Sequence, residues 1–249
     1  MSTVTDVREV GAEELLAVCA DPFVRHQVDP AATRRAWVSG RAAVVHGTRG
    51  RLGESSPGPV FTCLGPREEL EPLMREVAPR VAPPVRLTVE DASYDAVPEG
   101  WRYERHGHWH WMLTRDPCRP PADHVVEVDD DTEVDGLLDS ANPDSFARPG
   151  TPGVECWLGV REHGRLVAVG ALRREADGTG HLRGVSVLPS HTGRGLGRSV
   201  SAALTLRALA GASGVATLGV YVSNAPALAI YHRLGYAVRH TFASGPTNR

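Results

Sequence analysis

The chain has 249 residues, of which 41% are hydrophobic and 23% are charged, and its formal net charge at pH 7 is -3. This composition is typical of a globular protein, and it argues against disorder and against a membrane partner, since no apolar run approaches about 18 residues. The near-neutral charge argues against nucleic acid as a partner, because domains that bind DNA or RNA usually carry a basic face.

Two further features of the composition limit the chemistry and the location. The 27 basic residues are all arginine, which excludes a Schiff base and the lysine of a phosphate-binding P-loop. The N-terminus lacks the pattern of a secretory signal, so we expect a cytoplasmic protein. We expect free thiols, because the cysteines are far apart and form no C-x-x-C pair: Cys19, Cys63, Cys118 and Cys156.

The first half of the chain predicts an α/β domain over residues 1–117. The pattern predicts strands at 41–46, 59–64 and 85–90, a helix at 67–77, and a hairpin-like aromatic segment at 101–114. Within that segment, His106, His108 and His110 alternate with Trp109 and Trp111. A zinc site on the histidine face is conceivable, but no carboxylate or cysteine lies near in sequence, so packing or solvent contact is favoured.

Prolines divide the chain near its middle. Pro117, Pro120 and Pro121 disfavour both helix and sheet, so we expect a linker at 118–123 and a second domain at 124–249. The second domain predicts strands at 124–128, 155–160, 166–173, 181–188, 216–222 and 236–242. Helices are predicted from 131 to before 142, after the glycine-rich segment 191–197, and at 224–234. The expected fold is a mixed α/β sheet flanked by helices, which the first half repeats more faintly.

The glycine-rich segment is the first candidate site. Gly193, Gly195 and Gly197 follow a strand and open a helix, so unpaired backbone N–H groups and the positive end of the helix dipole share one concavity. This arrangement predicts an anion site. A dinucleotide-binding site is disfavoured, because no Asp or Glu follows Asp177.

The second candidate site is the helix expected at 224–234. Asn224 and Tyr231 are seven residues apart, nearly two helical turns, so they lie on one face with Tyr231 about 10 Å further along the axis. An amide and a phenol could therefore face one elongated ligand.

The two segments together resemble the GNAT superfamily of acyl-CoA-dependent N-acyltransferases. The resemblance covers residues 124–242 and rests on Val185–Gly197 followed by Asn224, Ala227, Tyr231 and Leu234-Gly235-Tyr236. It implies a mostly antiparallel GNAT-type sheet and acetyl-CoA as co-substrate, with no metal. It also implies CoA contacts from Val185, Ser186, Val187, Thr192, Gly193, Arg194, Gly195, Leu196, Gly197, Arg198 and Asn224. The family usually has Arg or Gln where this chain has Thr192, and Arg194 or Arg198 could supply the missing charge.

The implied reaction is direct attack of an unprotonated amine on the thioester. The resemblance implies that a free N–H near Val187 stabilises the oxyanion, and that Tyr231 is the general acid for the departing thiolate. His181 is the candidate base. Strand alternation predicts that it shares a face with Arg183, Val185 and Val187. A chain of water molecules remains an alternative base, and Tyr231 could instead be an ordinary half-buried aromatic residue.

The acceptor is expected to be a primary amine of a small molecule or a peptide. Specificity would come from the connection at 140–154, where Phe146 and Arg148 offer an aromatic ring and a cation, unless this is only a shaped surface loop. The N-terminal domain would shape the acceptor site or form a homodimer contact. Two alternatives stay open: a non-catalytic CoA-binding module, and an acyltransferase that uses a longer acyl chain.

Overall fold

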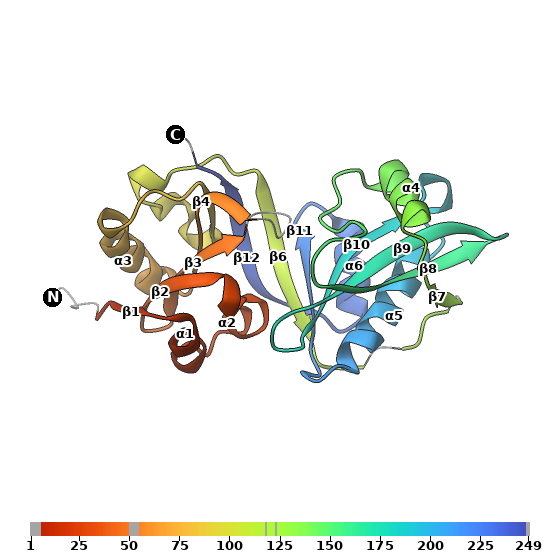
Figure 1. Cartoon of the computed structure of the whole chain (residues 1–249), viewed down its shortest axis with the longest axis horizontal. Helices are drawn as coiled ribbons and strands as arrows, with labels where there is room; N and C mark the ends of the chain where they lie inside the picture. Colours follow the sequence, from red (N-terminus) through yellow and green to blue (C-terminus); the bar gives the residue numbers. More distant parts are fainter. Residues whose placement is uncertain (1–5, 50–54, 118, 123, 248–249) are drawn as a thin grey trace. The chain divides into compact units, whose positions relative to one another are not determined.

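The computed structural model describes residues 6–49, 55–117, 119–122 and 124–247. The chain forms two compact units that are each discontinuous in sequence. The first unit contains residues 1–111, 221–223 and 239–249, and the second contains residues 112–220 and 224–238. Figure 1 labels the elements of both units. None of the helices within the described ranges is long and apolar enough to cross a membrane.

The first unit is a sheet with helices. Its elements are β1 (Arg8–Val10), α1 (Ala12–Val18), α2 (Pro22–Gln27), β2 (Thr33–Ser39), β3 (Ala42–Arg49), β4 (Ser55–Leu64), α3 (Arg67–Val77), β5 (Arg86–Glu90), the first part of β6 (Gly107–Thr114) and most of β12 (Ala237–Pro246). Strands β1 to β4 are antiparallel neighbours, and β5 runs parallel to β4. The C-terminal strand β12 is antiparallel to β5, so the end of the chain extends the sheet of the first unit.

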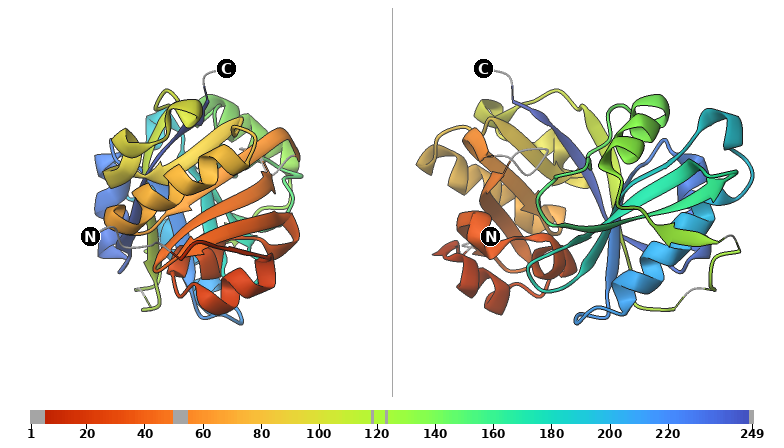
Figure 2. Two further views of the ribbon diagram at one scale, coloured as in Figure 1. Left: turned by 90° about the vertical axis from the view of Figure 1, so that its left-hand side faces the viewer. Right: turned by 45° about the vertical axis from the view of Figure 1, so that its right-hand side comes forward.

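Helix α3 covers the core of the first unit. Its buried residues recur at three- and four-residue steps, Leu70, Leu73, Met74 and Val77, which places them on one side of the helix. They belong to one hydrophobic cluster with Trp37, Phe61 and Trp101. Figure 2 shows α3 lying across the strands of this unit.

The second unit carries the candidate site. Its elements are β7 (Val125–Glu127), α4 (Asp131–Ala141), β8 (Val154–Glu162), β9 (Arg165–Arg174), β10 (Gly180–Val187), α5 (Leu196–Leu209), β11 (Ala216–Tyr221) and α6 (Ala225–Arg233). The strand order is β7-β8-β9-β10-β11. All neighbours are antiparallel except β10 and β11, which are parallel. The expected mixed, mostly antiparallel sheet flanked by helices, with an α/β N-terminal part, is confirmed.

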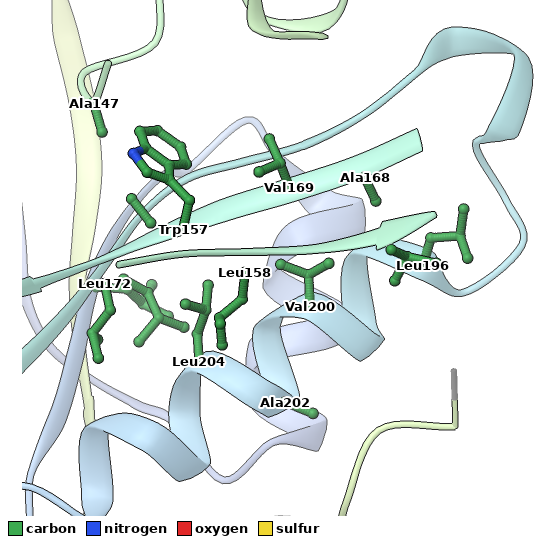
Figure 3. Close-up of a cluster of buried hydrophobic side chains, with 14 of the residues drawn as sticks. Ala147, Trp157, Leu158, Ala168, Val169, Leu172, Leu196, Val200, Ala202 and Leu204 are labelled. Atoms are coloured by element: carbon green, nitrogen blue, oxygen red, sulfur yellow. The ribbon is translucent and has the colours of Figure 1, made fainter. Parts of the chain in front are cut away.

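Helices cover both faces of this sheet. Leu196, Val200 and Leu204 follow a four-residue spacing along α5 and pack on the face from which Leu158 and Leu172 project (Figure 3). Trp157 and Val169 project from the opposite face, toward Ala147 in the connection after α4 (Figure 3). We call these the α5 face and the α4 face. All eight side chains are less than 9% exposed, so each face has a closed core.

Several predicted helix bounds and turns are confirmed, and in two of them single residues determine the local structure. Asp130 accepts hydrogen bonds from the N–H groups of Thr132 and Glu133, and α4 begins at Asp131 as expected. Helix α3 has the predicted bounds. The strands predicted at 155–160 and 166–173 are joined by a hairpin, since His163 and Gly164 both have positive φ, as a two-residue turn between antiparallel strands requires.

Two predictions differ from the structure or fall partly outside it. The hairpin-like segment at 101–114 is wrong: only β6 is a strand, and Tyr103 instead forms an isolated bridge with Thr247. Of the expected linker, residues 119–122 contain no helix or strand, and Cys118 and Asp123 lie outside the described residues. The other three cysteines are free thiols, as predicted.

Candidate active site

Strands β10 and β11 part in the middle of the second unit. Their parallel pairing joins Gly180–Leu182 to Ala216–Leu218, while β10 continues to Val187. On the other edge of β10, the N–H of Leu188 donates to the carbonyl of Val167. Because alternate N–H groups of a strand point to opposite edges, the N–H of Val187 points to the side where the pairing with β11 has ended. It is therefore placed to donate to a ligand between the two strands.

A β-bulge precedes this opening. The register of β10 against β9 shifts by one residue between Arg183 and Ser186, and Gly184 lies there with φ of 59°. A Cβ on Gly184 would lie 3.0 Å from Ser145 Oγ, so both the backbone conformation and the space favour glycine. Bulges bend a strand and re-aim its side chains, and this one directs the last residues of β10.

The bulge corrects the predicted alternation of side chains. A Cβ added to Gly170 would lie 3.0 Å from Val185 Cγ2, and one added to Gly197 would lie 3.4 Å from Val187 Cγ2. Both valines therefore lie on the α5 face. His181 and Arg183 precede the bulge and lie on the α4 face, as does Ser186, whose Oγ accepts from Asn142 Nδ2 at 3.3 Å. His181 thus shares a face with Arg183, but not with the two valines. The prediction was wrong there because one extra residue reverses the two-residue alternation.

The glycine-rich segment forms the entrance of α5. Gly195 caps the helix with φ of 85°, and the first bond within the helix runs from the N–H of Ser199 to the carbonyl of Gly195. The N–H groups of the first turn before Ser199 therefore have no partner within the helix. Gly197 packs closely, because a Cβ there would lie 3.4 Å from Val187 Cγ2. The helix entrance and the end of β10 thus adjoin one another, and both offer backbone donors.

The polar side chains of this segment differ in how they are used. Arg194 forms a two-armed ion pair with Glu162, with Nη1–Oε2 and Nη2–Oε1 distances of 3.0 and 2.7 Å. The hydroxyl of Thr192 donates to the carbonyl of Pro189 at 3.0 Å. Arg198 is exposed in the first turn of α5. Both predicted cations are exposed, but Arg194 is held by the Glu162 carboxylate, whereas Arg198 lies in the first turn of α5.

Helix α6 carries the second predicted pair. Asn224 caps this helix, because its Oδ1 accepts from the N–H of Ala227 at 3.2 Å. The helix ends at Gly235, which has φ of 88°. Asn224 is exposed, whereas Tyr231 is 8% exposed and packs edge-on against Tyr236, with ring centroids 5.9 Å apart.

The environment of Tyr231 keeps its phenol protonated. Burial raises the pKa of Tyr231 to about 12, and this rise is opposed by a hydrogen bond with the side chain of Ser201 on α5. A phenol with this pKa holds its proton throughout the neutral range. It is therefore in the protonated form that a general acid for a departing thiolate requires.

His181 is buried beside β11. It is 6% exposed, it pairs in register with Thr217, and its Nδ1 lies 2.9 Å from Thr217 Oγ1. Thr217 Oγ1 also lies 3.5 Å from the carbonyl oxygen of Gly180. In the tautomer in which Nδ1 donates to Thr217, Nε2 keeps its lone pair and can accept a proton. Burial lowers the pKa of His181 well below its usual value, and the charges of Arg183 and Arg173 lower it further. The neutral imidazole is the form a base requires.

The connection after α4 covers the α4 face at the bulge. A Cβ added to Gly184 would lie 3.0 Å from Ser145 Oγ and 3.5 Å from Ala147 Cβ, so this loop lies directly over the bulge. Arg148 points elsewhere: its Nη1 pairs with Asp135 and Asp139 at 3.3 and 2.7 Å, and both carboxylates belong to α4. The guanidinium of Arg148, which was predicted to contact the acceptor, therefore anchors this loop to α4.

Sequence reasoning missed two charged residues on the α4 face. Arg173 is the register partner of His181 on β9, and Glu175, directly after β9, pairs with Arg173 at 3.5 Å. Their side chains are only 13% and 4% exposed. The available signal was the two-residue spacing of Arg173 and Glu175 directly after the buried apolar run 166–172 of β9.

The histidines of β6 are spread over different partners. His108 Nε2 lies 3.4 Å from Asp91 Oδ2, and His110 Nδ1 lies 2.9 Å from Thr241 Oγ1. Among the residues that the structure describes, no three His, Cys, Asp or Glu side chains are grouped as a metal ion would require. Trp109 and Trp111 donate to Ser244 Oγ and Gln27 Oε1, so the indoles pack within the first unit.

Comparisons with known proteins agree with this geometry. The model of the acetyltransferase (GNAT) family matches residues 123–236. A solved structure assigned to the GNAT acetyltransferases, from Novosphingobium aromaticivorans, shares 26% identity over 68% of this chain and 71% of its own, with a TM-score of 0.51. A GCN5-related N-acetyltransferase from Kribbella flavida shares 19% identity over 88% of this chain and 91% of its own, with a TM-score of 0.54.

The likeness of fold extends over the first half of the chain. A tandem GNAT protein from the clavulanic acid biosynthesis pathway covers 98% of this chain and all (100%) of its own, with 13% identity and a TM-score of 0.50. None of the curated proteins matches this chain significantly. The family match spans the parted strands, the entrance of α5 and Tyr231. The chain therefore contains an acetyltransferase domain of the GNAT family, at residues 123–236.

Proposed function

We propose that the second unit transfers the acetyl group of acetyl-CoA to a primary amine of a small molecule or peptide by direct attack. One observation carries the proposal: the opening between β10 and β11 adjoins the glycine-capped entrance of α5. The entrance offers N–H donors and a helix dipole for a pyrophosphate, and the opening offers the edge of β10 to an extended pantetheine arm.

The chain's own residues can serve each step of this reaction. His181 Nε2 takes a proton from the acceptor ammonium, directly or through water, and the amine attacks the thioester carbonyl. The N–H of Val187 donates to the oxygen that gains negative charge. As the C–S bond breaks, Tyr231 gives its proton to the thiolate, and the nitrogen of the new amide releases its second proton, which restores the phenol through solvent. The products are the amide and free CoA. Arg198 and the N–H groups of the α5 entrance hold the pyrophosphate.

The acetyl donor also favours a cytoplasmic location, since acetyl-CoA is an intracellular metabolite. The test is an assay of acetyl-CoA with a panel of primary amines, which follows thiol release and the mass of the product together. We expect stoichiometric CoA and N-acetyl product with at least one amine. Acetyl-CoA binding without thiol release across the panel would instead indicate a non-catalytic binding module.

A further inference from the structure

A partly buried charged cluster lies on the α4 face before the bulge. It consists of Arg173, Glu175 and Arg183. His181 lies opposite Arg173 in the sheet and two residues before Arg183 in the sequence, and Arg183 lies opposite Ala171. Arg183 directly precedes Gly184 at the bulge, so this end of the cluster adjoins the place where an acceptor would meet the thioester. Glu175 lies further from the bulge, opposite Thr179.

The cluster holds more positive than negative charge. Arg173 and Glu175 form a pair at 3.5 Å that is largely shielded from solvent. Arg183 interacts with the charges of both, attracted by Glu175 and repelled by Arg173, and burial with this repulsion lowers the pKa of Arg183 to about 10. Two guanidinium groups and one carboxylate thus lie on this part of the α4 face, and the carboxylate is paired with Arg173. An unbalanced charge is costly away from water, so a partner anion would stabilise this arrangement.

Arg173 also has a hydrogen-bond donor that a ligand could use. Arg173 Nε is buried without a hydrogen bond partner in the part of the chain that the structure describes, and it lies under Gly153 of the covering loop. A guanidinium binds a carboxylate through two parallel N–H donors, which fixes its orientation. One carboxylate would supply one negative charge, which matches the single excess positive charge of the cluster. A phosphate, with nearly two, would overcompensate it.

The position of the cluster sets how far the anion lies from the reacting amine. Arg183 and Val187 are four residues apart, about 13 Å along an extended strand and less across the bulge. An arginine side chain and a small acceptor molecule can together span this distance. The covering loop with Ser145 and Ala147 closes the α4 face above, which favours a compact acceptor.

We propose that the acceptor is an amino-acid-like molecule whose carboxylate binds Arg183 and Arg173 while its amine faces the thioester. This inference rests on the proposed acetyl transfer and names its acceptor class. Arg183 is then a specificity-determining residue. Arg173 serves two partners, Glu175 and the bound carboxylate.

The main experiment compares α-amino acids with their α-amides as acceptors, in the whole protein with acetyl-CoA. The wild type is expected to prefer the acids at least tenfold in kcat/KM. At about pH 8, where His181 is neutral with or without Arg183, Arg183→Met should lower kcat/KM for the acids about 10- to 100-fold, the loss expected for charge-assisted hydrogen bonds. The amides should stay within about twofold. Arg165→Met removes an exposed arginine at the start of β9 and should change neither series. Equal use of acids and amides by the wild type, or an equal loss of both in Arg183→Met, overturns the inference while acetyl transfer stands.

Two further measurements decide the matter without turnover. Calorimetric titration of the amino acids into the protein, with and without CoA, should give heat that Arg183→Met abolishes. No heat in the wild type, or tighter binding of aminoalkylphosphonates, overturns the carboxylate assignment.

The thermal midpoint separates a ligand site from a structural ion pair. Because Arg173 still pairs with Glu175, Arg183→Met should keep or raise Tm. A fall of several degrees would show that Arg183 serves the fold instead.

Discussion

Arg194 and Glu162 join the glycine-rich segment to the hairpin of β8 and β9 through two parallel hydrogen bonds of 3.0 and 2.7 Å. His191 adds a weaker contact, with its Nε2 at 3.6 Å from the same carboxylate. The pair fixes the loop but occupies the guanidinium that sequence reasoning offered to a pyrophosphate. The two arginines of the segment, Arg194 and Arg198, therefore have different roles.

Substitution of each arginine should separate these roles. Arg198→Met is expected to weaken CoA binding by about tenfold or more, because it removes an exposed cation from the helix entrance. Arg194→Met should change the Kd of CoA by less than about threefold, since its charge is already paired. Isothermal titration of CoA into both variants checks this. Equal losses would mean that Arg194 leaves Glu162 and binds the ligand.

Tyr231→Phe should lower kcat far more than it changes acetyl-CoA binding. General acid catalysis contributes about 10²- to 10⁴-fold, so we expect a loss of that size with Kd within about twofold. Because the pKa of Tyr231 is raised to about 12, its deprotonation should produce no alkaline decline in rate below about pH 11. Steady-state kinetics across pH, with binding measured in parallel, tests both statements.

Tyr236→Phe is the matched control for this variant. Tyr236 is 2% exposed and its hydroxyl lies 3.0 Å from Thr205 Oγ1, so it resembles Tyr231 in burial and partner type. Its loss should lower stability by about 1 kcal/mol and leave kcat nearly unchanged. A similar fall of kcat in both variants would attribute the Tyr231 effect to packing rather than to acid catalysis.

His181 should set the acidic limb of the pH–rate profile below its ordinary pKa. Burial and the two neighbouring arginines lower the pKa of His181 well below 6.5, so the base stays deprotonated as the pH falls through 6.5. The limb should therefore lie well below pH 6.5 in the wild type. His181→Ala should lower kcat and remove this limb. An unchanged profile in the variant would assign proton removal to a chain of water molecules.

His240 links the stability of the first unit to pH. Its Nδ1 contacts Glu90 and its Nε2 lies 3.1 Å from Asp21 Oδ1, and the ring stacks on Phe242. Burial lowers the pKa of His240, but the hydrogen bonds and charges of Asp21 and Glu90 outweigh it and raise the value to about 9. The stabilising contribution is therefore complete below pH 6.5 and is lost as the pH rises through 9.

The expected size of this effect is about 3 kcal/mol, from the difference between pKa values of 6.5 and about 9. Urea unfolding of the wild type at pH 6 and pH 9.5 should show the loss, and His240→Gln should remove most of it. His46 should show the opposite pH dependence. Burial and the charges of two arginines lower the pKa of His46, so its contribution to the free energy of unfolding is lost as the pH falls below 6.5. An identical pH dependence in wild type and His240→Gln would refute the link.

Sequence reasoning succeeded where one residue decides the local structure. Asp130, Gly195 and Gly235 act through their own side chain or φ angle, so the ends of α4, α5 and α6 could be read from the chain. Asn224 was placed correctly at the start of α6, but its amide caps the helix.

The remaining features depend on distant partners. The bulge at Gly184 reversed the expected facing of Val185 and Val187, and no local signal distinguishes this glycine from others in strands. The ion pair of Arg194 joins residues 32 positions apart, and that of Arg173 depends on which strand face is buried. Charge partners of this kind follow from strand register, which pattern analysis does not determine.

The most direct measurement is calorimetric titration of acetyl-CoA into the wild type and into Gly195→Val. Gly195 has φ of 85°, so a β-branched residue there should distort the entrance of α5 that is assigned to the pyrophosphate. Gly214→Val is the control, because Gly214 also has positive φ but lies after the other end of α5. We predict saturable binding at one site in the wild type and in Gly214→Val, weakened at least tenfold in Gly195→Val. No heat from the wild type at millimolar acetyl-CoA, or equal affinity in all three proteins, would contradict the assignment.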